Sequence, residues 1–170
     1  RGYFTQYEFS ASTLLRLMQA NRLDAISVCD HAAGILDDLV VFSGHDLLAH
    51  QIKSQIFPTP FRLKTELVSH SLIADISKSW IALREEYPNK RIYINYVLPG
   101  YPSTSDKNHF ENVGHSADLF SYLTDPETKL NKDALLNSEW APFIRDLIIA
   151  STLNEDQFFE MFFQLKFYDQ

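Results

Sequence analysis

The feature that most constrains this chain is a turn between two β-forming runs. Residues 43–46, Ser-Gly-His-Asp, have turn composition and separate residues 37–42 from residues 47–53. A turn there sets Phe42 opposite Leu47, so facing positions sum to 42 + 47 = 89. We therefore predict an antiparallel hairpin whose register is fixed by its turn.

This register places Asp38 directly across from Gln51. Because side chains alternate along a strand, Gln51 and Lys53 share the face of Asp38, whereas His50 and Ile52 point to the other side. A carboxylate, a carboxamide and an ammonium then converge on one patch. Such a set suits metal-assisted hydrolysis of a phosphodiester, since Mg²⁺ needs only one or two carboxylates beside waters and substrate phosphate. The lysine would orient the attacking water or stabilise charge in the transition state.

A second interpretation of the same residues is a solvent-exposed hairpin face with a weak cross-strand pair between Asp38 and Lys53. Asp37 takes the place of Asp38 if the register slips by one residue. Asp30, at the end of the preceding strand, is either a second acid of the site or a turn-forming residue.

The remaining pattern predicts an α/β or mixed α+β domain with a helical C-terminal portion. Helices are expected at residues 3–21, 63–87, 117–123, 132–153 with a break at Pro142, and 157–163 behind a capping box at Asn154. Further strands are expected at residues 25–29, 91–98 and 164–168, and a surface loop at residues 99–116.

Length and composition fit one domain over residues 1–170, with a core of about residues 1–105 and an acidic helical portion of about residues 106–170. No apolar run is long enough for a membrane span, so we expect no membrane partner. The single cysteine fits a reducing cytoplasm. A start at Arg1 rather than Met suggests a piece of a longer chain, and the resemblance described below implies that this piece is its N-terminal part.

The net charge of −7 argues only weakly against DNA. Residues 1–105 hold ten acidic and ten basic residues, whereas residues 106–170 hold twelve acidic and five basic residues and carry the whole −7. Residues 53–91 hold seven basic and four acidic residues, a local charge of +3 that begins at the lysine of the predicted site.

The arrangement of Asp38, Gln51 and Lys53 resembles the active-site signature of the PD-(D/E)XK nuclease superfamily, which has the restriction-endonuclease-like fold. In that superfamily an Asp on one strand and a (Glu/Gln)-x-Lys on its hairpin partner follow a leading helix. The opening Gly2-Tyr3-Phe4-Thr5-Gln6 and the Phe-rich end are similar to N-terminal double-stranded DNA endonuclease effector domains of bacterial antiphage proteins.

The resemblance implies a central mixed sheet flanked by helices, with Asp38 and Gln51 as metal ligands for Mg²⁺ or Mn²⁺ and Lys53 as the catalytic lysine. It also implies a Glu or Gln on the leading helix near the metal. The motif position favours Gln6, whereas the helical angle favours Glu8, which borders an apolar stripe with Phe4 and Leu15. Candidate DNA contacts are Ser54, Gln55, Arg62 and Lys64.

The resemblance further implies a bacterial cytoplasmic effector that cuts double-stranded DNA, assembles into a homo-oligomer and is controlled by sensor domains of the same chain. Because Gln51 replaces the more frequent Glu, one alternative is a weak or inactive nuclease fold that serves as a DNA-binding or oligomerisation module. Another alternative is a nuclease that uses the same site on RNA.

Overall fold

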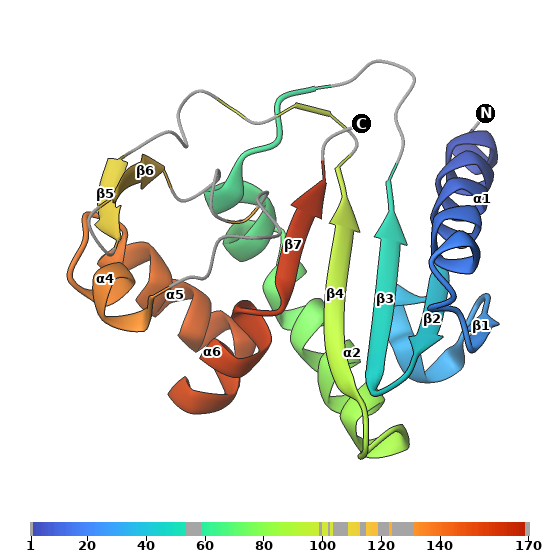
Figure 1. The fold of residues 1–170 in the computed structure, drawn as a ribbon. Helices are drawn as coiled ribbons and strands as arrows, with labels where there is room; N and C mark the ends of the chain where they lie inside the picture. Colours follow the sequence, from blue (N-terminus) through green and yellow to red (C-terminus); the bar gives the residue numbers. More distant parts are fainter. Residues whose placement is uncertain are drawn as a thin grey trace.

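The computed structural model describes residues 2–53, 59–98, 100–101, 103, 109–112, 115–118, 123 and 131–168. Its centre is a five-stranded sheet with the order β1-β2-β3-β4-β7 (Figure 1). The first three strands pair antiparallel, and β3, β4 and β7 run parallel. The predicted mixed α+β class is confirmed, with helices on both sides of a mixed sheet. The strands are β1 (Ala25–Ser27), β2 (Leu39–Ser43), β3 (Asp46–Ile52), β4 (Arg91–Val97) and β7 (Leu165–Tyr168).

The β2–β3 hairpin has the predicted register. Phe42 pairs with Leu47, and Leu39 pairs with His50. Gly44 has a φ of 57° in the turn, a conformation that glycine adopts without a steric penalty. The short turn therefore determines which residues of the two strands face each other.

The crossover from β3 to β4 contains two helices rather than the single helix predicted over residues 63–87. A π-helix, η2 (Lys64–Ser69), is followed by α2 (Leu72–Glu86). Between them Ser71 has a φ of 58°, which a continuous helix does not allow. The apolar spacing continues across this break, so periodicity alone did not reveal it.

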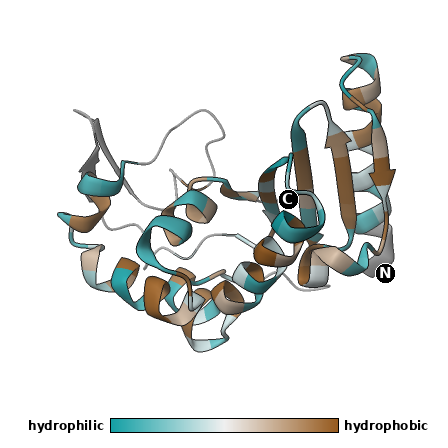
Figure 2. Cartoon of the chain, turned by 90° about the horizontal axis from the view of Figure 1, so that it is seen from below, coloured by the Kyte–Doolittle hydropathy of each residue, from teal (hydrophilic) through white to brown (hydrophobic). Residues whose placement is uncertain are grey.

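Helices cover the two faces of the sheet unequally. On one face α1 (Gly2–Gln19) packs Leu17 against Leu39 and Val41. The larger core, which includes Trp80 and Phe167, fills the other face. The strands are coloured largely hydrophobic when seen from below (Figure 2). The 3₁₀ helix η1 (His31–Leu36) lies on the side of α2.

Three further helices precede the last strand: α4 (Lys132–Leu136), α5 (Ala141–Ser151) and α6 (Glu155–Phe162). The break predicted at Pro142 lies at residues 137–140, and Pro142 occupies the first turn of α5, where its missing N–H costs no helical hydrogen bond. The predicted capping box is confirmed, because the Asn154 side chain accepts from the Gln157 N–H while Gln157 accepts from the Asn154 N–H.

A small antiparallel pair, β5 (His109–Asn112) and β6 (His115–Asp118), lies where we predicted an irregular loop. The helix predicted over residues 117–123 is wrong at residues 117 and 118, which belong to β6. The two strands contain no β-branched residue and a single aromatic one of the Phe, Tyr or Trp type, so the composition typical of strands is absent from them.

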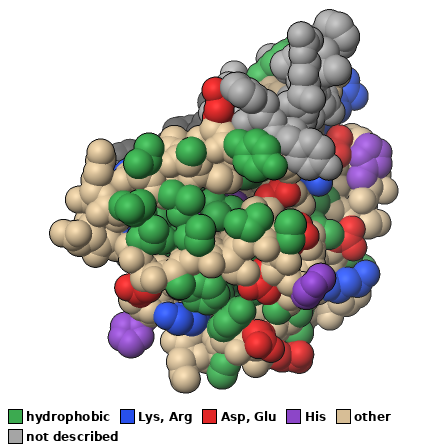
Figure 3. All heavy atoms as spheres, turned by 90° about the vertical axis from the view of Figure 1, so that its right-hand side faces the viewer, with side chains coloured by type: hydrophobic (Ala, Val, Ile, Leu, Met, Phe, Trp, Pro, Cys, Tyr) green, Lys and Arg blue, Asp and Glu red, His purple; other side chains and the backbone are tan. Residues whose placement is uncertain are grey.

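The outer side of α1 exposes apolar side chains. Tyr7 is 71% exposed, and Leu15 and Met18 are each 59% exposed. Ile26 and Val28, in and after β1, are exposed beside them, and hydrophobic side chains gather on this side of the molecule (Figure 3). None of the helices in the described part of the chain is both long and apolar enough to cross a membrane.

Candidate active site

Three groups donate hydrogen bonds to the carboxylate of Asp38. Gln6 Nε2 donates to Oδ1 at 2.9 Å, and the Ile52 backbone N–H donates to Oδ2 at 2.7 Å. Gln51 Nε2 also donates to Oδ2. Gln6 and Asp38 are 32 positions apart in the sequence, so the fold, and not local chain geometry, creates this meeting point.

The start of β2 explains why Asp38 is held here. The strand begins at Leu39, which pairs with His50, so β2 offers no carbonyl opposite the N–H of Ile52. The carboxylate of Asp38 accepts this N–H in place of a strand carbonyl. The hairpin register then brings Gln51 to the same carboxylate, as the sequence predicted.

The structure distinguishes between Gln6 and Glu8. Gln6 is half-buried and contacts Asp38, and its Nε2 also lies 3.5 Å from the Ile52 carbonyl oxygen. Glu8 is exposed. The helical angle favoured Glu8 only if Leu15 faces the core. In the structure Leu15 is 59% exposed, and Leu17, which is 7% exposed, faces the core instead.

Lys53 follows the last residue of β3 and is exposed. Its backbone N–H donates to the Val97 carbonyl at 3.1 Å, which continues the pairing of β3 with β4. Strand alternation therefore keeps Lys53 on the side of Gln51. The convergence of its ammonium on the Asp38 carboxylate stays a prediction.

The other two aspartates near the hairpin have different surroundings. Asp37 is half-buried, and its backbone carbonyl accepts from the Cys29 N–H at 2.8 Å. Asp30 caps η1 by accepting from the Ala32 N–H at 3.0 Å, and it also accepts from the Tyr87 hydroxyl at 3.2 Å. Asp30 therefore has the turn-forming role that was one of its two interpretations.

Two of the four predicted DNA-contacting residues belong to the part of the chain that the structure describes. Ser54 and Gln55 lie outside the described residues. Arg62 and Lys64 are exposed, and the Lys64 ammonium lies 5.9 Å from the centroid of the Trp140 ring. Lys64 is therefore positioned by a cation–π contact at the start of η2.

Ion pairs reduce the charge of the basic stretch over residues 53–91. Three of its cations each lie within 4 Å of a carboxylate, and exposed pairs of this kind contribute little to stability. Asp75 already belongs to the four acidic residues of the stretch, so only the pairs with Glu160 and Asp46 bring further negative charge to it. The pairs are Lys78 with Asp75, Arg84 with Glu160, and Arg91 with Asp46.

Tyr96 is a member of this site that the sequence did not reveal. The parallel register of β3 and β4 pairs it with Gln51. Burial raises the pKa of Tyr96 to about 12, and the negative charges of Glu66 and Asp38 add to this effect. The phenol is therefore a protonated hydrogen-bond donor at neutral pH. Only the β3–β4 register could have identified it, and that register depends on the whole crossover.

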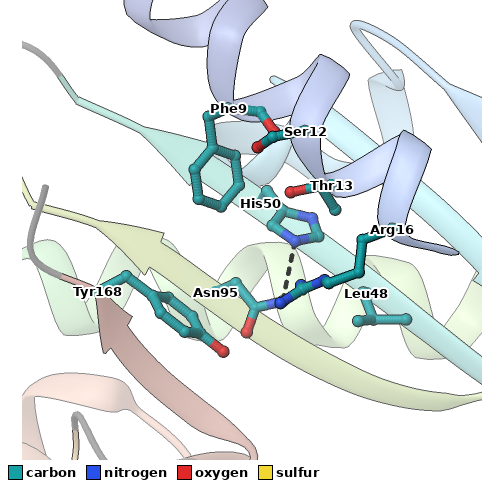
Figure 4. A pocket seen from close by; sticks show the side chains of 8 residues that line it. All are labelled: Phe9, Ser12, Thr13, Arg16, Leu48, His50, Asn95 and Tyr168. Carbon is teal, nitrogen blue, oxygen red and sulfur yellow. Dashed lines mark hydrogen bonds between the residues drawn. The ribbon is translucent and has the colours of Figure 1, made fainter.

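His50 points away from Gln51, as predicted, and lies on the α1 side of the sheet (Figure 4). Its Nδ1 lies 3.2 Å from the Leu39 carbonyl oxygen, and its Nε2 lies 3.1 Å from Asn95 Nδ2. Burial lowers the pKa of His50 to about 4, and the nearby charge of Arg16 acts in the same direction. The neutral ring then donates from Nδ1 to Leu39 and accepts at Nε2 from Asn95.

The side chains around Asp38 could supply the smallest number of oxygen ligands with which a protein binds a hard divalent cation. Asp38 supplies a carboxylate, and rotation of the amides of Gln6 and Gln51 would present their oxygens instead of their nitrogens. Within the described ranges, no group of three or more His, Cys, Asp or Glu side chains is arranged to hold a metal. One carboxylate with two amide oxygens suffices for Mg²⁺ only when water and substrate phosphate complete its shell.

Comparison of the chain with protein-family models, curated proteins and solved structures finds no match. The arrangement of side chains around Asp38 is therefore the basis for a functional proposal.

Proposed function

We propose that this chain is a divalent-metal-dependent endonuclease that hydrolyses phosphodiester bonds of double-stranded DNA. The supporting observation is that Gln6, Gln51 and the Ile52 N–H all converge on the carboxylate of Asp38, and Lys53 is the residue that follows Ile52. A purely solvated hairpin face, the alternative interpretation of the sequence, does not require a glutamine from a distant helix to contact this aspartate. A resemblance to the PD-(D/E)XK nucleases, in sequence signature and in element order, favours the same conclusion.

In this proposal Asp38 holds Mg²⁺ or Mn²⁺, and the amide oxygens of Gln51 and Gln6 supplement it. The bound ion would polarise the phosphate and lower the pKa of an attacking water. The ammonium of Lys53 would orient that water or stabilise the extra charge on the phosphate in the transition state. The protonated hydroxyl of Tyr96 would serve as a hydrogen-bond donor in the same region.

Cleavage of supercoiled plasmid DNA in the presence of Mg²⁺ or Mn²⁺ tests the proposal. We expect Asp38→Asn and Lys53→Ala to lower the rate by about 100-fold or more, as is typical when a group that stabilises the transition state is removed. Asp37→Asn is the matched control, because it removes the neighbouring carboxylate and leaves Asp38 intact. Undiminished cleavage by Lys53→Ala would remove Lys53 from the mechanism, and equal losses in Asp37→Asn and Asp38→Asn would refute the assignment of Asp38.

The second candidate function is a nuclease fold that has lost its activity and binds DNA or partner domains. The presence of a single carboxylate among the three side chains at the site favours it. Calorimetric titration with Mn²⁺ separates the two functions. Mn²⁺ binding that Asp38→Ala abolishes supports the enzyme, whereas DNA binding without any Mn²⁺ binding supports the module. Parallel assays with duplex DNA and RNA decide between the two substrates.

We further propose that the chain is an effector domain of a bacterial cytoplasmic antiphage protein and is controlled by other domains of its chain.

Self-association is supported by the exposed apolar face of α1. In an antiparallel pairing of two copies, Tyr7 would meet Met18 and Ala11 would meet Leu15, so the stripe is complementary to itself. Sedimentation at several concentrations tests this, with Leu15→Glu expected to give a monomer. An active monomer of the unaltered protein would refute the oligomer.

A further inference from the structure

A cavity of about 260 Å³ lies between α1 and the strands β3, β4 and β7, on the opposite side of the sheet from Gln51 (Figure 4). We refer to it as the α1 pocket. Four of its residues, Phe9, Ser12, Thr13 and Arg16, lie on consecutive turns of α1. The strands supply the other wall, in which Asn95 of β4 and Tyr168 of β7 project to the same side of the sheet.

The charge of the lining favours an anion. Among the described residues that line this pocket, Arg16 is the one charged side chain, and none of them is an Asp or a Glu. The hydroxyls of Thr13 and Tyr168 add neutral donors, whereas the Ser12 hydroxyl already donates to the Phe9 backbone carbonyl at 3.0 Å. Among the residues that the structure describes, the Arg16 guanidinium and the Tyr168 hydroxyl have no hydrogen-bond partner, so both are available to a ligand.

The apolar and amide groups of the pocket favour a planar ring. Phe9 and Tyr168 place aromatic rings on its wall, and aromatic side chains bind flat heterocycles by stacking. Asn95 is only 6% exposed, and one of its N–H groups is held by His50 Nε2 at 3.1 Å. Its carbonyl oxygen and second N–H remain unpaired within the described part of the chain. A side-chain amide with a free donor and a free acceptor matches the edge of a nucleobase.

We propose that the α1 pocket binds a nucleoside monophosphate, with the phosphate at Arg16, the base against the aromatic wall and the base edge on Asn95. The volume is below the range of about 300–1,000 Å³ for sites that enclose drug-sized ligands, so no more than one nucleotide would fit, with its phosphate at the surface, where Arg16 is exposed. This assignment does not depend on Asp38, Gln51 or Lys53. It therefore holds or fails independently of the nuclease proposal.

Calorimetric titration of the whole chain with AMP, GMP, CMP and UMP, in separate experiments without divalent metal, tests the inference. We expect at least one of the four to bind, and inorganic phosphate and the corresponding nucleoside to bind at least 10-fold more weakly. Arg16→Gln is expected to weaken nucleotide binding at least 10-fold. The control is Arg22→Gln, which removes an exposed arginine beyond the end of α1 and should leave binding unchanged.

Tyr168→Phe is the second variant, because it removes only the hydroxyl and preserves the ring on the wall. We expect it to weaken binding less than Arg16→Gln does. Three results would overturn the proposal: no heat with any of the four nucleotides at millimolar concentration, phosphate binding as tightly as the nucleotides, or equal effects of Arg16→Gln and Arg22→Gln.

Discussion

The buried imidazole of His50 predicts how the stability of this protein depends on pH. His50 is 3% exposed, and burial lowers its pKa from 6.5 to about 4. Because the folded state holds the ring neutral, the unfolded chain binds a proton at a higher pH than the folded chain does. The stabilising contribution is therefore fully present above pH 6.5 and is lost as the pH falls toward 4.

The size of this effect follows from the shift. Each pKa unit corresponds to about 1.4 kcal/mol, so the full loss is about 3 kcal/mol, and about 2 kcal/mol of it falls between pH 7 and pH 5. Urea unfolding of the unaltered protein and of His50→Gln at both pH values measures it. The glutamine can still donate to the Leu39 carbonyl and accept from Asn95, but it does not titrate.

From pH 7 to pH 5 the free energy of unfolding should decrease in both proteins, and the decrease should be about 2 kcal/mol smaller in His50→Gln than in the unaltered protein. His45→Gln, at an exposed turn position, is the control and should retain the full loss. Carboxylate titration contributes equally to all three proteins, so it cancels in the comparison. The reasoning is refuted if His50→Gln loses as much stability between pH 7 and pH 5 as the unaltered protein.

Three further predictions concern single side chains. Gly34 and Gly44 both have positive φ, but a Cβ at Gly34 would lie 2.5 Å from Ser79 Oγ, whereas a Cβ at Gly44 meets nothing. Thermal unfolding should therefore show Gly34→Ala to be destabilised by about 1–3 kcal/mol more than Gly44→Ala, and equal losses would contradict the contact. Asn154→Ala removes the cap of α6 and should lower the free energy of unfolding in urea by about 1 kcal/mol. A spectrophotometric titration compares tyrosine ionisation in the unaltered protein and in Tyr96→Phe. The variant should lack a phenolate signal that forms near pH 12 in the unaltered protein. If it lacks a signal that forms near pH 10 instead, Tyr96 is not buried as described.

The hairpin could be predicted from the sequence because its register depends on a local turn. Residues 43–46 alone determine that Phe42 faces Leu47, and the position of Gln51 beside Asp38 follows from that pairing. The match of Gln6 with Asp38 could not be derived in the same way. It depends on which face α1 turns toward the sheet, and the exposed Leu15 makes the helix apolar on two sides.

Three other features could not be predicted, each for a different physical reason. Tyr96 joins the site through the parallel register of β3 and β4, which is set by a crossover rather than by a short turn. The break at Ser71 was not visible because the apolar spacing of residues 63–87 continues through it. The pair β5 and β6 could not be predicted because neither strand contains a β-branched residue.

The pairing of β7 with β4 determines the order in which the sheet can be completed during synthesis. The two strands are separated by residues 98–164, so the ribosome must translate α4, α5 and α6 before β4 acquires its second neighbour. The β2–β3 hairpin, by contrast, can close within a few residues of its own emergence. We therefore expect the nascent chain to expose the open edge of β4, with Ile94 and Tyr96 on it, while residues 98–164 are translated. During this interval the unpaired edge of β4 is open to aggregation, and a chaperone that covers it would prevent this.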